Sequence, residues 1–198
     1  MNFSMLGSAR AATSNLNVLA EALQQAVVEV RSGETASGTG IIWGGAGLVV
    51  TNAHCIRRGA SVQVIAGGKW REAHALAYHP HHDLALLAAP SVTGPLLELR
   101  DPESLRTGEL VFAHGHPLGV TDALAMGVLH AVTRDKSGSP RWIVADVRLA
   151  PGNSGGPLVD AEGRLMGINS MVINGLGVAV PASLVQRFVE RSLSQRAA

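Results

Sequence analysis

The sequence predicts an all-β protein with a short helix near each end. Glycine accounts for 23 of the 198 residues, whereas aromatic residues make up only 4%. The glycines separate short apolar runs, as in residues 37–43, 47–54 and 61–68, and this spacing is typical of short strands joined by tight turns. Hydrophobic residues make up 46% of the chain and charged residues 16%, which is enough apolar surface for a substantial core.

The strands are expected in two groups with a linker between them. At the start of the first group, Val28 and Val30 alternate with charged residues, as in a half-buried strand. Proline, glycine and charged residues concentrate in the linker. We expect a single domain over residues 1–198, with a first strand group at about 27–95, a linker at about 90–109, a second strand group at about 108–181 and a helix at about 182–195.

Helical periodicity marks both ends of the chain. Residues 15–26 carry leucines at helical spacing, and Ser14 or Asn15 is a suitable N-cap. Residues 1–13 lack such a pattern, and we expect a flexible leader there. The C-terminal helix follows a proline and places these apolar residues on one face: Leu184, Val185, Phe188, Val189 and Leu193.

Composition and charge exclude several classes of function. The formal net charge is +1 and the basic residues form no continuous block, so we expect no nucleic-acid partner. No apolar run reaches the roughly 18–20 residues of a membrane helix, and residues 1–19 lack the apolar core of a secretory signal. We therefore expect no membrane partner and a cytoplasmic location. Cys55 is the only cysteine, which excludes an intrachain disulfide and fits a reducing compartment.

The strongest chemical signal is the segment 151–157, Pro-Gly-Asn-Ser-Gly-Gly-Pro. A serine becomes a nucleophile when a base takes its proton and hydrogen-bond donors stabilise the oxyanion that forms. The glycines beside Ser154 allow a sharp backbone turn and a close approach of a substrate carbonyl. An ordinary glycine-rich turn has the same composition, so the segment alone leaves that alternative open.

A histidine and an aspartate each stand at one end of an apolar run. His54 follows the apolar run that ends at residue 50, where its ring can face a cleft and act as a general base. Asp83 precedes the apolar residues 84–89, where a partly buried carboxylate needs a partner such as an imidazole N–H. Each residue alone fits an ordinary surface or turn position. Together with Ser154, in this chain order, they predict a catalytic triad.

Several segments, taken together, resemble the trypsin-like serine proteases and, within them, the protease domain of the bacterial HtrA (Deg) family. They cover the chain from about residue 26 to 190 and include SGTGIIW, GLVVTNAHCI, HHDLALL, AHGHPLGV, MGVLHAV, DVRLAPGNSGGPLVDAEGRLMGIN and LGVAVPASLV. The resemblance implies that each strand group closes into a six-stranded antiparallel β-barrel, with the active site between the two barrels. It also implies a serine endopeptidase that acts on proteins or peptides.

The family likeness gives each site residue a role. Ser154 would attack the peptide carbonyl, His54 would accept its proton and later protonate the leaving amine, and Asp83 would orient His54. The backbone N–H groups of Gly152, Asn153 and Ser154 would form the oxyanion hole. This chemistry needs no metal and no other cofactor.

The likeness also suggests a mostly apolar S1 pocket, and therefore a small or medium aliphatic P1 residue. Its walls would be Leu149, Ser170, Met171, Val172 and a residue near Leu176 or Val178. Arg148 leaves an alternative open, because an inward side chain would admit acidic P1 residues. We expect Arg148 to face outward or to pair with a carboxylate.

The chain departs from the family pattern in several places. It ends soon after the expected C-terminal helix, so we expect the PDZ domain of most HtrA proteins to be absent. Cys55 is expected to be a small buried residue rather than a nucleophile. Five histidines have spacings that are poor for metal ligation, and we expect them to be solvated loop residues: His79, His81, His82, His114 and His116.

Regulation and rival functions stay open at this point. Trypsin-like folds often rest with a misformed oxyanion hole, so a latent enzyme is one hypothesis. An activating protein partner or a homo-oligomer contact would then order the loops near residues 31–39, 133–141 and 171–177. The main rival is a pseudoprotease or chaperone-like module that binds peptides on the same fold. An esterase is disfavoured, because the strands alternate with turns rather than with helices.

Overall fold

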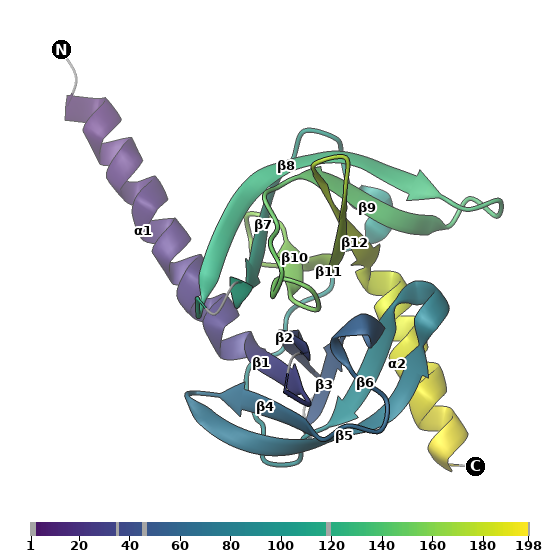
Figure 1. The fold of residues 1–198 in the computed structure, drawn as a ribbon. Helices are drawn as coiled ribbons and strands as arrows, with labels where there is room; N and C mark the ends of the chain where they lie inside the picture. Colours follow the sequence, from purple (N-terminus) through teal and green to yellow (C-terminus); the bar gives the residue numbers. More distant parts are fainter. Residues whose placement is uncertain (1–2, 35, 45–46, 118–119, 198) are drawn as a thin grey trace.

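The computed structural model describes residues 3–34, 36–44, 47–117 and 120–197. Two closed antiparallel β-barrels make up most of the chain, and a helix stands at each end (Figure 1). The fold class expected from the sequence, with two six-stranded barrels, is therefore confirmed.

The first barrel closes in the strand order β1-β2-β3-β6-β5-β4, with β4 paired to β1. Its interior is apolar because alternate residues of each strand point inward; Val28 and Val30 of β1 pack there with Val64 and Leu87. The strands are β1 (Val27–Ser32), β2 (Ala36–Trp43), β3 (Leu48–Thr51), β4 (Val62–Ala66), β5 (Lys69–His79) and β6 (Leu84–Ala88).

The second barrel closes in the order β10-β11-β12-β9-β8-β7, with β7 paired to β10. Val111, Leu129, Ile143 and Leu158 belong to its buried core. Its longest hairpin, β8–β9, extends beyond the rest of the barrel (Figure 1). The strands are β7 (Leu110–Gly115), β8 (Ala123–Arg134), β9 (Pro140–Asp146), β10 (Pro157–Val159), β11 (Leu165–Ile173) and β12 (Leu176–Pro181).

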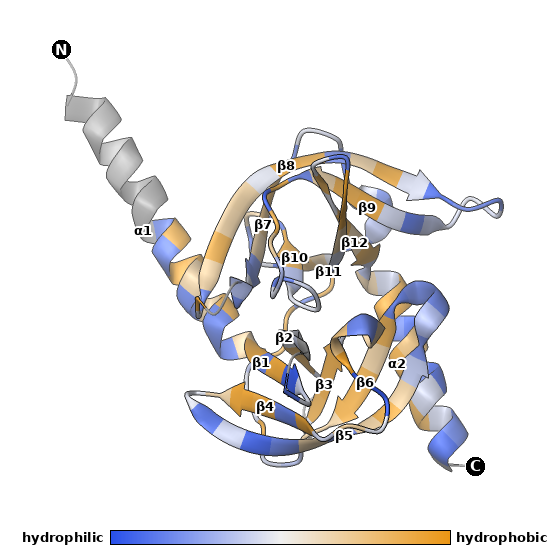
Figure 2. Cartoon of the chain, viewed as in Figure 1, coloured by the Kyte–Doolittle hydropathy of each residue, from blue (hydrophilic) through white to orange (hydrophobic). Residues whose placement is uncertain are grey.

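The C-terminal helix α2 (Ala182–Ala197) packs against both barrels. Val185 and Phe188 of α2 belong to one buried cluster with Leu86 of β6 and Leu165 of β11. Figure 2 shows apolar residues along β3 and β6, on the side of the first barrel near α2. Burying a large aliphatic or aromatic side chain stabilises the fold by about 1.5–3 kcal/mol. This shared cluster therefore helps to fix the two barrels relative to each other.

The N-terminal helix α1 covers Phe3–Ala26 and is longer than the helix expected at residues 15–26. The expectation of a flexible leader over residues 1–13 is therefore wrong from Phe3 onward, and residues 1–2 lie outside the described range. An alanine-rich segment without proline favours a helix even where its apolar residues form no stripe. Leu23, near the end of α1, is buried, whereas the start of the helix projects away from the barrels (Figure 1).

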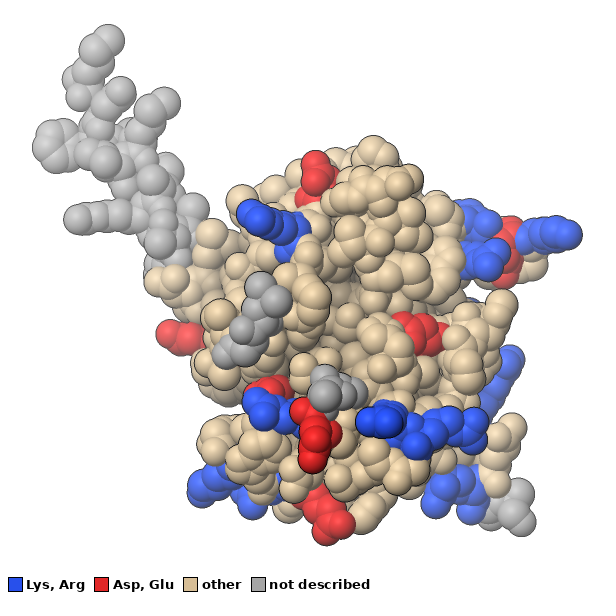
Figure 3. Space-filling model, viewed as in Figure 1, with Lys and Arg blue, Asp and Glu red and all other residues tan. Residues whose placement is uncertain are grey.

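Charged residues of both signs are dispersed over the visible face of the molecule (Figure 3). On the face drawn in Figure 3, Lys and Arg side chains alternate with Asp and Glu among a larger uncharged area. In the described ranges, no helix combines the length and the hydropathy needed to span a membrane.

Candidate active site

His54 and Asp83 meet because β3 and β6 are antiparallel neighbours. His54 lies in a 3-10 turn just after β3, and Asp83 lies just before β6, so both stand at the same edge of the first barrel. The His54 Nδ1 atom is 2.8 Å from Asp83 Oδ2. The backbone N–H of His54 donates to Asp83 Oδ1 at 3.1 Å. One carboxylate therefore fixes both the ring and the main chain of His54.

Asp83 is also contacted by the second barrel. The hydroxyl of Ser170, on β11, donates to Asp83 Oδ2 at 2.6 Å. From the first barrel, the Asn52 side chain donates to the Asp83 carbonyl at 2.9 Å. Burial favours a raised pKa for Asp83, but the hydrogen bonds from His54 and Ser170 outweigh burial and lower that pKa. Asp83 is therefore a stable carboxylate. The sequence predicts Ser170 only as part of the S1 pocket wall. Its hydrogen bond to Asp83 is not apparent from the sequence.

The protonation equilibrium of the His54 imidazole is shifted toward the protonated form. The hydrogen bond to Asp83 and, next, the neighbouring Cys55 raise the pKa of His54 well above its ordinary value of 6.5, although partial burial opposes the shift. About half of the His54 side chain remains exposed, so its ring borders solvent. Cys55 itself is buried, as expected from the sequence.

Ser154 lies in the loop before β10 and faces the same cavity as His54. Its hydroxyl donates to the Ser170 carbonyl at 3.3 Å. In the described part of the chain, no hydrogen bond joins this hydroxyl to His54. Ser170 thus contacts Asp83 through its side chain and Ser154 through its main chain. Of the three residues predicted as a triad, His54 and Ser154 line one cavity, and Asp83 contacts His54 and Ser170 behind it.

The backbone before Ser154 forms a tight turn. The N–H of Asn153 donates to the Ala150 carbonyl at 3.0 Å, and Gly152 has φ +105°. Proline at the second position and a positive φ at the third are typical of a type II turn. A side chain at Gly152 would collide with the carbonyl oxygen of His116. Glycine is therefore required here both for its φ and for space.

The sequence predicts three N–H donors for the oxyanion hole, and this turn leaves only two of them without an acceptor. The Asn153 N–H is used inside the turn and is not free to act as a third donor. Within the described residues, the N–H groups of Gly152 and Ser154 have no acceptor.

Thr39 of β2 ties this loop to the first barrel. Its backbone N–H donates to the Ser154 carbonyl at 2.8 Å, and its hydroxyl donates to the Gly152 carbonyl at 2.8 Å. The Thr51 hydroxyl donates to the Thr39 carbonyl at 2.7 Å. Thr39 is fully buried and was not singled out from the sequence. The only signal is a threonine between two glycines, where the absence of side chains allows another backbone to approach.

A cavity of about 400 Å³ adjoins His54 and Ser154. Four of the five S1 residues expected from the sequence line it: Leu149, Ser170, Met171 and Val172. Val178 does not line it; this residue is buried on β12, opposite Met171 and Val144 in the sheet. Arg148 is exposed and lies outside the lining. The pocket wall is thus largely apolar, and no charged residue except His54 contributes to it.

The expectation of a solvated loop is wrong for His114. This residue is fully buried in β7, and neither ring nitrogen has a partner among the described residues. Burial lowers the pKa of His114 to about 4, so the ring is neutral. Strand β7 continues through His114 to Gly115, so this residue lies in a strand rather than in a loop. His116 is also largely buried. In the described ranges, no group of His, Cys, Asp and Glu is arranged to hold a metal ion.

Comparison with known proteins agrees with this architecture. A profile of the trypsin-like peptidase domain matches residues 38–168. Serine protease Do-like HtrA of Bacillus subtilis is 34% identical over 181 residues, covering 82% of this chain and 40% of that protein. Protease Do-like 1, chloroplastic, of Arabidopsis thaliana is 32% identical over 196 residues, covering 90% of this chain and 43% of that protein. The chain thus spans less than half the length of these relatives. It belongs to the trypsin-like peptidase family and is related to the HtrA and Do-like serine proteases.

Proposed function

We propose that this chain is a serine endopeptidase with His54, Asp83 and Ser154 as its catalytic triad. The observation that carries the proposal is the shared set of contacts at Ser170. The Ser170 hydroxyl binds the same Asp83 oxygen that lies 2.8 Å from His54 Nδ1, and the Ser170 carbonyl accepts from Ser154. Nucleophile and base therefore line one cavity, with the orienting carboxylate hydrogen-bonded to the base, which is the arrangement that acyl transfer needs.

The reaction follows from this geometry. Rotation of the Ser154 side chain moves its hydroxyl from the Ser170 carbonyl toward His54. His54 takes the proton as Ser154 Oγ attacks the peptide carbonyl, and the N–H groups of Gly152 and Ser154 stabilise the oxyanion. The protonated His54, stabilised by Asp83, then protonates the leaving amine. Water, deprotonated by His54, attacks the acyl-enzyme, and His54 returns the proton to Ser154.

The test is hydrolysis of unfolded casein by purified protein. We expect cleavage by the natural sequence, loss of cleavage in Ser154→Ala, and unchanged cleavage in Ser61→Ala. Ser61 is an exposed serine far from the cavity lining and is the matched control. If the natural sequence binds casein without cleaving it, the peptide-binding alternative on the same fold holds instead.

The apolar cavity favours small or medium aliphatic P1 residues. Leu149, Met171 and Val172 supply its wall, and exposed Arg148 lies outside it. A charged P1 side chain would lose its hydration there without gaining a partner. Peptides that vary only at P1 should be cleaved faster with Val, Ala or Leu than with Glu or Arg. A rate for Glu well above that for Val would contradict this specificity.

We also propose that contact with another protein, such as a second copy, raises the activity. This part rests on the Ser154 hydroxyl, which donates to Ser170 rather than to His54 in the isolated chain. Specific activity should rise with enzyme concentration as copies associate. Constant specific activity across the whole range, with only monomer present by sedimentation, would contradict activation by self-contact.

A further inference from the structure

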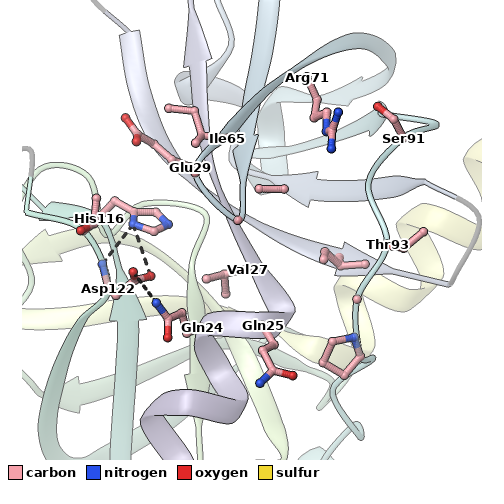
Figure 4. Close-up of a pocket in the computed structure, with 17 residues that line it drawn as sticks. Gln24, Gln25, Val27, Glu29, Ile65, Arg71, Ser91, Thr93, His116 and Asp122 are labelled. Carbon is pink, nitrogen blue, oxygen red and sulfur yellow. Dashed lines mark hydrogen bonds and ion pairs between the residues drawn. The ribbon is translucent and has the colours of Figure 1, made fainter.

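A second cavity lies away from the triad and has a volume of about 630 Å³. It is bounded by the end of α1, strand β1, the β4–β5 hairpin, the start of the inter-barrel linker and the loop after β7 (Figure 4). His54, Asp83 and Ser154 do not line it. Its lining combines apolar residues with polar and charged side chains, and a few placed polar groups are what orient a ligand in a binding pocket.

Two nitrogen atoms in this lining are buried without a hydrogen-bond partner among the described residues: Arg71 Nε and His116 Nε2. The His116 side chain is only 10% exposed. In Figure 4, Arg71 and His116 stand on opposite sides of the cavity. A buried polar group without a hydrogen-bond partner costs free energy. A ligand that satisfied these groups would recover that cost.

The hydrogen bonding of His116 identifies its free nitrogen as a donor. The backbone N–H of Asp122 donates to His116 Nδ1 at 3.2 Å, so Nδ1 has no proton. Burial lowers the pKa of His116, which keeps the ring neutral, and the remaining proton therefore lies on Nε2. Arg71 Nε also carries a proton, because a guanidinium is always protonated. Both unpartnered atoms are therefore donors that need an acceptor.

The charges around the cavity favour one anionic group. The Arg71 side chain makes no hydrogen bond and no ion pair with any described residue, so its charge has no carboxylate partner there. The two carboxylates of the lining are engaged: Glu29 accepts from Arg31 at 2.6 Å, and Asp122 accepts from Gln24 at 2.8 Å. A second anionic group near these carboxylates would be repelled.

We propose that this cavity binds a small organic molecule with one carboxylate or phosphate group. The anionic group binds Arg71, since guanidinium and oxyanions form charge-assisted hydrogen bonds. The rest of the molecule offers an acceptor to His116 and hydroxyl or amino donors to Glu29 and Asp122. Ser91 and Thr93, which also line the cavity, add polar contacts on the side of Arg71 (Figure 4).

The proposal is tested by calorimetric titration with matched probes. L-serine is compared with L-serinamide, and glycerol 3-phosphate with glycerol, because each pair differs in the anionic group. We expect saturable binding of at least one anion and none of its neutral counterpart. Binding of L-serine would identify a carboxylate site, and binding of glycerol 3-phosphate would identify a phosphate site. Succinate, with two carboxylates, should bind more weakly than the preferred probe.

Variants locate the bound anion. Arg71→Gln should weaken binding at least about tenfold, because a charge-assisted contact is lost. Lys69→Gln removes the same charge from an exposed position on the same hairpin, outside the cavity lining, and should leave the affinity unchanged. Arg71→Lys keeps the charge but lacks the planar donor set, so an intermediate affinity is expected. It also serves as the test if Arg71→Gln fails to fold.

All titrations use the Ser154→Ala protein, so they do not depend on peptidase activity. A failed casein assay would therefore leave this proposal standing, and a failed titration would leave the proposed protease standing. The proposal is contradicted if neither anion binds, or if an anion binds Arg71→Gln and Arg71→Lys as tightly as the parent protein.

Discussion

The carboxylate of Asp83 holds His54 at two points, the ring Nδ1 at 2.8 Å and the backbone N–H at 3.1 Å. With Nδ1 committed to this carboxylate, Nε2 is the ring atom left to exchange a proton with a nucleophile. The hydroxyl of Ser170 adds a third donor to Asp83 from the second barrel. The base of the proposed mechanism is thus oriented from both sides of the cavity.

The first prediction concerns pH. His54 accepts a proton only when it is neutral, and the hydrogen bond to Asp83 raises its pKa above 6.5. The value of kcat/KM should therefore increase with pH, with a midpoint above 6.5, because the neutral form grows as pH rises through the raised pKa. Initial rates on an uncharged peptide substrate measure this midpoint. A midpoint at or below 6.5 would show that Asp83 does not shift the base as described.

The second prediction is that Ser154 and His54 act as one unit. Ser154→Ala, His54→Ala and the double variant should lose activity by similar factors, on the order of 10⁶ in kcat. Each change alone removes the attack step, so a second change has little left to remove. Single-turnover rates of the three variants provide the comparison. Losses that multiply in the double variant would mean that the two residues contribute independently.

The third prediction concerns Thr39, whose hydroxyl lies between the loop after β7 and the turn before Ser154. The hydroxyl accepts from the His116 N–H at 3.1 Å and donates to the Gly152 carbonyl at 2.8 Å. Thr39→Val keeps the shape but breaks both bonds and should cost about 1–3 kcal/mol of stability. We also expect a lower kcat at similar KM. Thr133→Val, at an exposed threonine, is the control; equal effects of both changes would contradict the role of Thr39.

The fourth prediction separates steric space from backbone conformation at Gly155. Gly155 has φ +85° and Gly59 has φ +81°. A side chain at Gly155 would collide with the Thr39 carbonyl and the Thr51 hydroxyl, whereas Gly59 has no atom within 4 Å of such a side chain. Gly59→Ala should therefore cost only about 1 kcal/mol, the usual cost of a positive φ in alanine.

Gly155→Ala should cost several kcal/mol more than Gly59→Ala, because backbone atoms of the nucleophile loop must shift. Urea unfolding of both variants measures the difference. Similar stabilities would mean that the loop can relax around a methyl group.

The sequence predicts the triad because its members carry local signals. His54 and Asp83 each adjoin an apolar strand, and Ser154 lies in a distinctive glycine-rich segment. The two barrels follow from glycine-separated apolar runs together with the family resemblance. Long-range partners are different: the hydroxyls of Ser170 and Thr39 bind groups 87 and 113 residues away in the chain. No local pattern encodes such pairings, since they arise only when the barrels meet.

Other errors also have physical causes. The sequence predicts a solvated loop at His114, but β7 continues through Gly115 and buries the ring. The family likeness suggests Val178 as a pocket wall, whereas pairing with Val144 and Met171 buries it in the sheet. In both cases strand register decides the position of a side chain, and single residues do not determine register.

The most direct test of the central claim is labelling with a fluorophosphonate, which phosphonylates an activated serine. The adduct is mapped by mass spectrometry, with Ser154→Ala as the control. The proposed triad predicts one adduct, on Ser154, that is absent in the control and in His54→Ala. Folded protein that stays unlabelled at every concentration, or that is labelled equally in Ser154→Ala, would contradict an activated Ser154.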